Sequence, residues 1–358
     1  MAYSDFTGLS VGSTALEIGV ANIILKKMIQ QQLYRDGIGI TEVYSNGATA
    51  GGAVLRVPKV TASTSSFRQL GATVNGNFFN GNSIGVIGLG EELLVCNNIY
   101  DACEDVPQAQ HILSLGGASA LGVRAEEIAK NIARQMNAGT MAYQMAAVIN
   151  AVIAASGTKT DRFFIYDATK TGADASSPLS KFLDACASLD NGDTYNDVFP
   201  SVGRLALLRP SALSDLRKNG NIIVGGSNFA QEMVKSGAVD PETILPDVPG
   251  YRGMINDVAV FSVSNALWTL AESWMQQSAG YLDNIVGIIC AYNATGRGHA
   301  FPDSTKVIDS PLGQGLRIQP LSNFGVKVFF EKGIKLLAKG AVTEGSTAIT
   351  VLAPGSQE

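Results

Sequence analysis

One helical pattern, over residues 118–155, restricts the fold of this chain more than any other feature of its sequence. The apolar positions that form its stripe are Leu121, Ala125, Ile128, Ile132, Met136, Tyr143, Ala146, Ile149 and Ile153. This spacing predicts a single helix of roughly 55 Å. Gly139 lies near its middle, and glycine costs about 1 kcal/mol relative to alanine in a helix, so we expect a bend or a close contact there.

A second, amphipathic helix is predicted near the N-terminus. Leu16, Val20 and Ile24 recur at helical spacing, and the pattern stops at Asp36 and Gly37. The sequence leaves two interpretations open: an ordinary packing helix, or an arm that docks on a neighbouring subunit.

Residues 51–95 change to the texture of strands and turns, which indicates a long two-stranded ribbon with Phe67, Phe78 and Phe79 near its far end. Such a ribbon has too little internal core to be stable alone, so it must lie on another surface. A neighbouring subunit is one candidate.

From 160 to 309 short helices and strands alternate, which is typical of a compact α+β domain, and β texture returns in the tail. In the tail, an Asn-Phe-Gly turn and a Lys-Gly turn are expected to separate the strands. We expect helices at 177–189 and 211–218, and strands at 205–208, 258–263, 285–292, 316–320, 325–330 and 334–338.

Composition bears on the class of protein. Charged residues make up 16% of the chain and hydrophobic residues 46%, against about 25% charged in average soluble domains. The shortfall indicates either extensive self-association or a large monomeric core. The net charge of −5 and the lack of a basic patch argue against an electrostatic grip on nucleic acid. Neither an export signal nor a membrane anchor is expected, because the first basic residue is Lys26 and the apolar run at 146–155 is short.

Motifs for catalysis, cofactors or metals are weak. Gly85, Gly88 and Gly90 imitate a dinucleotide-binding turn, but Leu93 stands where the motif needs another glycine, and acidic residues precede it. His111 and His299 have no nucleophile or base arrangement nearby, and the four cysteines form no CxxC pair. We therefore predict no enzyme, and no catalytic, cofactor-binding or metal-binding residues.

The order of segments resembles the Hong Kong 97-type fold of tailed-bacteriophage major capsid proteins. Residues 54–60 (VLRVPKV) resemble the outgoing strand of its extended loop, and 99–107 (IYDACEDVP) are similar to the connector before its spine helix. Residues 203–211 (GRLALLRPS) resemble its axial-domain strand leading into a capped helix, and 325–337 resemble its closing peripheral strands.

The resemblance implies an α+β fold divided into five segments. They are an N-terminal arm with an amphipathic helix (1–50), an extended β-ribbon loop (51–95), a peripheral domain with the spine helix (96–159), an axial domain (160–309) and a return to the peripheral domain (310–358).

The resemblance also implies function and partners. The chain would assemble with itself, as hexamers and pentamers, into an icosahedral shell that encloses a phage genome. Because the arm begins almost at Met1, a separate scaffolding protein is implied, together with a portal, an optional decoration protein and double-stranded DNA packaged without sequence-specific binding. No membrane is involved, and the location would be the virion, preceded by the host cytoplasm during assembly. Lys59 and Asn323 have no context that assigns them to the covalent crosslink of some family members.

Two alternatives remain open: an encapsulin-type nanocompartment shell loaded with enzyme cargo, and a nicotinamide-dependent dehydrogenase using the glycines at 85–90. For the shell hypothesis, the side chains predicted to lie at the assembly interface are Leu16, Val20, Ile24, Val57, Phe67, Arg68, Phe78 and Phe79.

Overall fold

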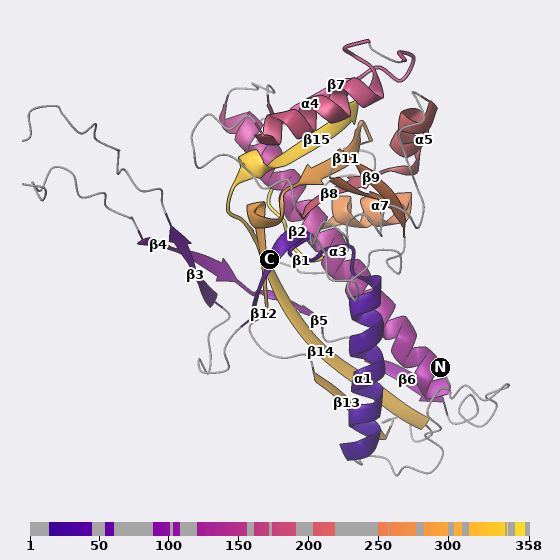
Figure 1. Cartoon of the computed structure of the whole chain (residues 1–358). Coiled ribbons are helices and arrows are strands. Elements are labelled where there is room, and N and C mark those ends of the chain that lie inside the picture. The colour runs from indigo at the N-terminus through magenta and orange to yellow at the C-terminus, as the bar shows by residue number, and fades with distance from the viewer. Residues whose placement is uncertain are drawn as a thin grey trace, which may run out of the picture.

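The computed structural model arranges two β-sheets along one long helix, with a two-stranded ribbon projecting from their junction (Figure 1). The α+β class predicted from the sequence is confirmed. The structure describes residues 14–44, 54–60, 89–100, 103–107, 120–155, 161–171, 174–190, 203–218, 250–256, 258–276, 283–299, 304–309, 315–340, 342 and 348–354.

The long helix is present as α3, Ala120–Ala154. Its length of 35 residues corresponds to about 52 Å. It contacts α1, α7 and β14, so the apolar residues along its middle are buried on several sides. The expected close approach at Gly139 is also present, because a Cβ atom there would lie 3.0 Å from the ring of Phe324. Glycine at this position leaves room for an aromatic ring to pack directly on the backbone of the helix.

A mixed six-stranded sheet forms one half of the molecule, at the top of Figure 1, in the order β7-β15-β11-β8-β10-β9. Its helices are α4 (Pro178–Asp190), α5 (Pro210–Lys218) and α7 (Asn265–Trp274). Its strands are β7 (Phe163–Tyr166), β8 (Arg204–Leu208), β9 (Tyr251–Ile255), β10 (Val258–Ser262), β11 (Ile285–Cys290) and β15 (Ile334–Lys339). Every residue of β8 and β11 is buried, which explains why these strands were recognisable as continuous apolar runs.

The second sheet has seven strands and is built around β14, Gly315–Val328, which runs down beside α3 (Figure 1). Along the path β1-β2-β12-β14-β13 the strands pair in turn, and β5 and β6 also pair with β14. The bounds are β1 (Arg35–Asp36), β2 (Gly39–Tyr44), β5 (Asn98–Tyr100), β6 (Glu104–Pro107), β12 (Thr295–His299) and β13 (Ser304–Asp309).

The C-terminal strands differ from the sequence prediction in two ways. The predicted turn between 316–320 and 325–330 is wrong, because β14 continues through Asn323 and Phe324, which pair with β5. Hydrogen bonds to a distant strand therefore override a local turn signal. In addition, β15 lies between β7 and β11 in the other sheet, so the strands that the sequence grouped in one closing segment divide between two sheets.

The arm helix α1, Thr14–Gln31, lies against the lower half of α3 (Figure 1). Its C-terminal end is fastened by Asn137 of α3, whose amide nitrogen donates to the Gln31 carbonyl (3.1 Å) and whose amide oxygen accepts from the Leu33 backbone nitrogen (3.1 Å). Lys27 and Glu126 add an ion pair at 3.5 Å. These contacts satisfy polar groups that a helix end leaves unpaired, and they fix the direction of the arm.

Candidate assembly surfaces

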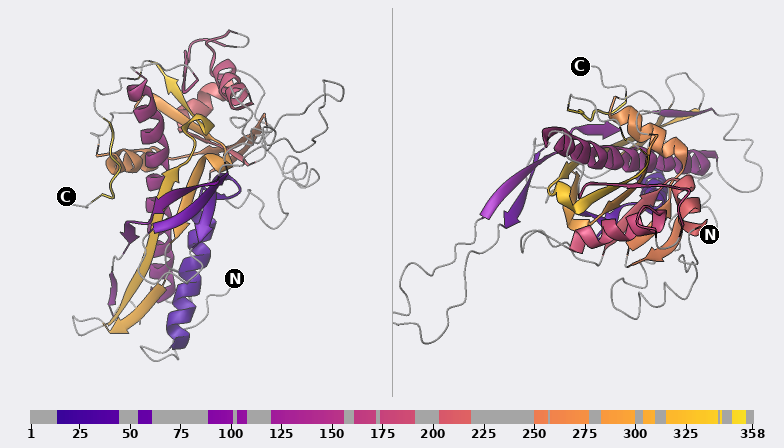
Figure 2. Two further views of the ribbon diagram at one scale, coloured as in Figure 1. Left: turned by 90° about the vertical axis from the view of Figure 1, so that its left-hand side faces the viewer. Right: turned by 90° about the horizontal axis from the view of Figure 1, so that it is seen from above.

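The ribbon consists of β3 (Val54–Val60) and β4 (Leu89–Val95), paired antiparallel from Val54 opposite Val95 to Val60 opposite Leu89. It points away from both sheets, as two directions of view show (Figures 1 and 2). The described part of its core is a small cluster of Leu55, Leu94 and Cys96, with Phe329 packed against it. A core of this size anchors the base of a ribbon but cannot stabilise the strands beyond it.

Two glycines make room for the base of the ribbon. A Cβ atom at Gly298 would lie 2.6 Å from Leu55 Cδ1 and 2.6 Å from Leu94 Cδ2. At Gly325 a Cβ atom would collide with the backbone of Val95 and Cys96. The base of the ribbon therefore lies directly on the backbones of β12 and β14. It occupies a notch that larger residues at positions 298 and 325 would fill.

A row of apolar side chains faces outward from the base of the ribbon. Burial alternates from residue 93 to 99, so Leu94, Cys96 and Asn98 point inward, while Leu93, Val95, Asn97 and Ile99 point outward. The exposed fractions are 51% for Leu93, 48% for Val95 and 59% for Ile99. We call Leu93, Val95 and Ile99 the β4–β5 row.

The arm helix has a second exposed apolar stripe. Ile18, Leu25 and Ile29 are 54%, 44% and 50% exposed, and Asn22 between them is exposed as well. The four positions lie on one line along the helix, because they are separated by four, three and four residues. We call Ile18, Asn22, Leu25 and Ile29 the α1 seam.

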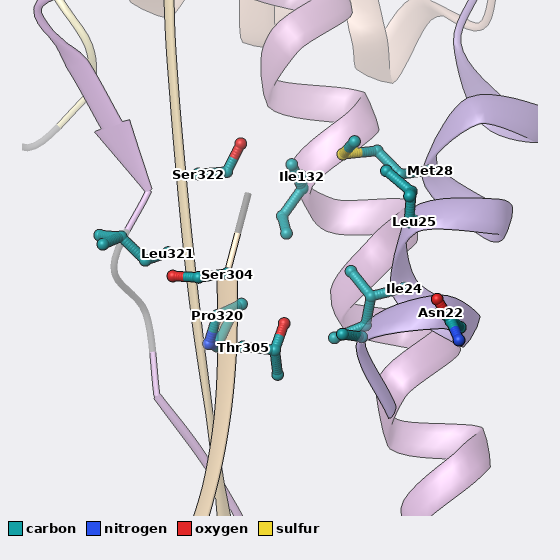
Figure 3. Close-up of a pocket in the computed structure, with 11 residues that line it drawn as sticks. Asn22, Ile24, Leu25, Met28, Ile132, Ser304, Thr305, Pro320, Leu321 and Ser322 are labelled. Carbon is teal, nitrogen blue, oxygen red and sulfur yellow. The ribbon is translucent and has the colours of Figure 1, made fainter. Parts of the chain in front are cut away.

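A pocket of about 200 Å³ adjoins the α1 seam, between α1, α3 and the strands β13 and β14 (Figure 3). Asn22 and Leu25 line its α1 side, and Thr305 and Leu321 line its strand side. Ser322 also lines it, and its buried hydroxyl has no hydrogen-bond partner in the described structure. The surface beside the seam is therefore hollowed rather than flat.

Four of the interface residues predicted from the sequence, Phe67, Arg68, Phe78 and Phe79, lie outside the described residues. Val57 lies in β3, where its backbone pairs with Glu92. Its assigned role, like that of the other four, stays a prediction.

The three predicted residues on the arm lie in α1. Val20 and Ile24 are 0% and 5% exposed, because they belong to the core cluster that includes α3. Leu16 lies in the first turn of α1. The helical periodicity of the sequence thus identified the side of α1 that packs into the core of its own subunit. The outward seam was missed because its asparagine interrupts an otherwise apolar repeat, although the spacing of four, three and four residues was a readable signal.

Gly90 and His299, the residues considered for chemistry in these motifs that the structure describes, belong to strands. The glycine-rich motif leads into β4, so Leu89 and Gly90 begin a strand where a phosphate-binding turn would need a helix. His299 closes β12, with its Nδ1 atom 3.0 Å from the Asn323 carbonyl oxygen. His111 lies outside the described residues. Within the described part of the chain, no group of three or more His, Cys, Asp or Glu residues is placed to hold a metal ion.

None of the helices in the described ranges combines the length and the apolar character needed to cross a bilayer.

Comparison with known proteins identifies the fold. No protein-family model and no curated protein sequence matches the chain. The capsid of Ralstonia phage GP4 matches with a TM-score of 0.55 at 10% identity, over 86% of this chain and 89% of that one. The capsid of cyanophage P-SCSP1u matches with a TM-score of 0.52 at 12% identity, over 94% and 92%. The head structure of Helicobacter pylori bacteriophage KHP40 matches with a TM-score of 0.50 at 10% identity, over 84% and 87%. The Hong Kong 97-type capsid fold expected from the order of segments is confirmed.

Proposed function

We propose that this chain, which has a phage capsid fold, is a major capsid protein that assembles with itself into an icosahedral shell around a phage genome. The observation that carries the proposal is the projecting ribbon with its exposed β4–β5 row. Two large apolar side chains of β4, Leu93 and Val95, are about half exposed on an element whose own described core is three residues, and Ile99 in strand β5, directly after the ribbon, is exposed as well. A row of this kind on a projecting element is typical of a surface that another subunit covers.

The three structures above support the same proposal, because two are phage capsids and one is a phage head, and each matches most of this chain. We infer hexamers and pentamers as the building units and the virion as the final location, reached through assembly in the host cytoplasm. A scaffolding protein, a portal and an optional decoration protein are the expected partners. The role is structural rather than enzymatic.

We also propose the division into arm (1–50), extended loop (51–95), peripheral domain (96–159 and 310–358) and axial domain (160–309) as the functional division of the chain. The sheets add one refinement to it. Since β15 pairs with β7 and β11, residues 334–339 are grouped with the axial strands, while β12, β13 and β14 share the other sheet.

Negative-stain electron microscopy and light scattering of the purified chain test the proposal. The expected result is closed shells or rings of five and six subunits. A discrete monomer under all assembly conditions would refute it. Particles isolated from the native source distinguish the alternatives: DNA inside them supports the phage capsid, whereas a single packaged enzyme would identify an encapsulin-type compartment.

Interaction with packaged DNA is proposed to be independent of sequence, because a net charge of −5 gives no electrostatic grip on phosphates. In a gel-shift assay the subunit is expected to bind DNA weakly and to release it as salt is added. A salt-resistant complex with one DNA sequence would contradict this part of the proposal.

The rest of the predicted ribbon (51–95) is proposed as a second part of the contact, with Val57 of β3 and with Phe67, Arg68, Phe78 and Phe79 as its side chains. Burying one phenylalanine is worth about 1.5–3 kcal/mol, and a closed shell repeats each contact in every subunit. Replacing Phe78 and Phe79 by serine is expected to block assembly without lowering the melting temperature of the subunit. For Leu16, Val20 and Ile24 the proposed role is indirect, through the position of α1.

A further inference from the structure

We propose that the surface of α3 and α7 beneath residues 348–354 is a binding site for an extended apolar peptide, and that this segment is its reversibly bound occupant. We call residues 348–354 the strap. The inference goes beyond the proposed function and does not depend on it, because it concerns contacts inside one subunit. It assigns to Asn150 of α3 the binding of the strap's backbone.

The two amide atoms of Asn150 hold one residue of the strap. Its amide nitrogen donates to the Ile349 carbonyl oxygen at 2.9 Å, and its amide oxygen accepts from the Ile349 backbone nitrogen at 2.7 Å. One side chain thus makes the two hydrogen bonds that a neighbouring strand would otherwise make with this residue. Further along the strap, the Leu352 backbone nitrogen donates to the carbonyl oxygen of Trp274, the last residue of α7, at 2.8 Å. The strap is therefore fastened to both helices.

The side chains of the strap alternate as they do in an extended strand. Ile349 is 7% exposed, Val351 and Ala353 pack against the same core cluster, and Thr350 between the first two is exposed. Within the described ranges, however, the strap pairs with no strand. Backbone hydrogen bonds combined with contacts to alternate side chains are the way in which proteins bind extended peptides. The strap therefore has the features of a bound peptide ligand.

The strap buries little of itself in the core that holds it. Ile349 is its one buried side chain among the described residues, and the three hydrogen bonds given above are those that its backbone makes to this part of the chain. Local opening is favoured where few apolar contacts and few hydrogen bonds have to be broken. We therefore infer that the strap opens while the rest of the subunit stays folded.

The arm helix shows the contrast on the same spine helix. Asn137 of α3 holds the arm with the same pair of amide hydrogen bonds to passing backbone. The arm, however, also buries Val20, Ile24 and Met28 in the core that it shares with α3. Its release would break that core, so the arm should open only with the whole subunit. Two similar asparagine contacts thus hold one segment that is separable and one that is not.

Hydrogen–deuterium exchange of the full, unassembled chain, read at the Ile349 and Leu352 amides, tests the reversible binding. Both amides should exchange more slowly than in the unfolded chain, yet at least ~100-fold faster than the amides of Met141 and Met145 in the middle of α3. Their rates should not change in low urea, because a local opening exposes little surface. Exchange as slow as that of α3, with the same dependence on urea, would overturn the inference, and so would exchange at the rate of the unfolded chain.

Variants of the full chain test the role of Asn150. Asn150→Ala removes two hydrogen bonds, so the Ile349 and Leu352 amides should exchange about 10-fold faster while the middle of α3 is unchanged. Asn137→Ala is the matched control and should leave the exchange of the strap as it is. Equal effects of the two variants on the strap would contradict the assignment. A loss of protection in α3 as large as that in the strap would show that the strap belongs to the core.

A synthetic peptide tests the binding site itself. In full-length Ile349→Ser the strap loses its buried side chain and should leave the site open. An acetylated and amidated peptide of sequence AITVLAP, the sequence of residues 348–354, should then bind at about 1 mM, the scale of the effective concentration of a tethered segment. Fluorescence anisotropy of the dye-labelled peptide measures binding. The double variant Ile349→Ser with Asn150→Ala should bind at least ~10-fold more weakly, because the backbone hydrogen bonds are lost. Equal binding by the two variants, or no binding to Ile349→Ser, would overturn the site.

Discussion

At the scale of single residues, the least expected feature is a buried polar network that joins the arm to the seven-stranded sheet and to α3. Arg297 is fully buried in β12 and pairs with Glu42 of β2, and it also donates to the side-chain oxygen of Gln32 at 2.9 Å. Tyr34 donates its hydroxyl to Gln144 Oε1 at 2.7 Å, and burial raises the pKa of this phenol well above its ordinary value. The hydroxyl is therefore neutral and keeps its role as a donor.

The network predicts a large effect for Arg297→Met. Removing the guanidinium takes away the ion pair of the almost buried Glu42 carboxylate, so the unfolding free energy should fall by about 3–5 kcal/mol. Arg317→Met is the control, because its pair with Asp105 is partly exposed and solvent screening makes its loss much less costly. Urea unfolding of the unassembled subunit measures both. The double variant Arg297→Met with Glu42→Gln should recover much of the loss, and an equal effect of the two single variants would argue against the buried pair.

Thiol reactivity gives a second prediction at this scale. Burial raises the pKa of Cys186 to about 12 and that of Cys290 to about 12, and Cys96 is buried as well, whereas Cys103 is exposed. Thiolates are the reactive form, so maleimide at pH 8 should label Cys103 alone in the folded subunit and all four cysteines in denaturant. Intact-mass spectrometry counts the labels. Rapid labelling of a second site in the native subunit would show that the core around it opens.

At the scale of elements, the ribbon depends on the notch formed by glycines of β12 and β14. Leu55 and Leu94 occupy the space that a side chain at 298 would need. The strands that project are thus oriented by the sheet beneath them, and not by their own pairing. This arrangement makes the direction of the ribbon sensitive to single methyl groups.

Gly298→Ala is therefore expected to shift the base of the ribbon and to lower shell yield, with a cost in subunit stability of about 1–3 kcal/mol from overpacking. In the Leu94→Ala background the same change should cost less, since the smaller side chain frees the space. A double-mutant cycle from urea unfolding, with shell yield from sedimentation, measures the coupling. Additive effects would mean that the two side chains do not compete for this notch.

The β4–β5 row is tested by Leu93→Ser with Val95→Ser. Both side chains are about half exposed in the subunit, so the variant should melt within a few degrees of the parent while shell assembly is lost. Val123→Ser with Leu183→Ser is the control, because these residues are 45% and 39% exposed on helices α3 and α4 outside the row. If the variant with Leu93→Ser and Val95→Ser still forms normal shells, the β4–β5 row is not part of the contact between subunits.

At the scale of the whole molecule, low charge and exposed apolar rows favour association driven by burial of apolar surface. Each subunit carries a net charge of −5, so copies repel one another weakly at low ionic strength. We expect assembly followed by light scattering to become more favourable as NaCl rises from about 50 to 500 mM, because salt screens this repulsion and leaves apolar contacts intact. Shells that dissociate over this range would instead be held by ion pairs between subunits.

The sequence by itself determined the elements whose periodicity is strong over many residues. The long helix is confirmed at Ala120–Ala154, and the buried strands Arg204–Leu208 and Ile285–Cys290 lie within two residues of their predicted bounds. The order of these elements resembles that of the capsid fold, and this resemblance predicted the fold. These features depend on local spacing, which a sequence contains directly.

Only the tertiary structure decided which surfaces remain exposed. The helix α1 has two apolar stripes that could each pack against α3. In the folded chain Val20 and Ile24 are buried, whereas Ile18 and Leu25 remain exposed. A predicted turn became part of β14 because β5, more than two hundred residues earlier in the chain, pairs with it there. Burial and strand pairing are set by contacts between distant segments, and the sequence pattern of one segment does not encode which partner covers it.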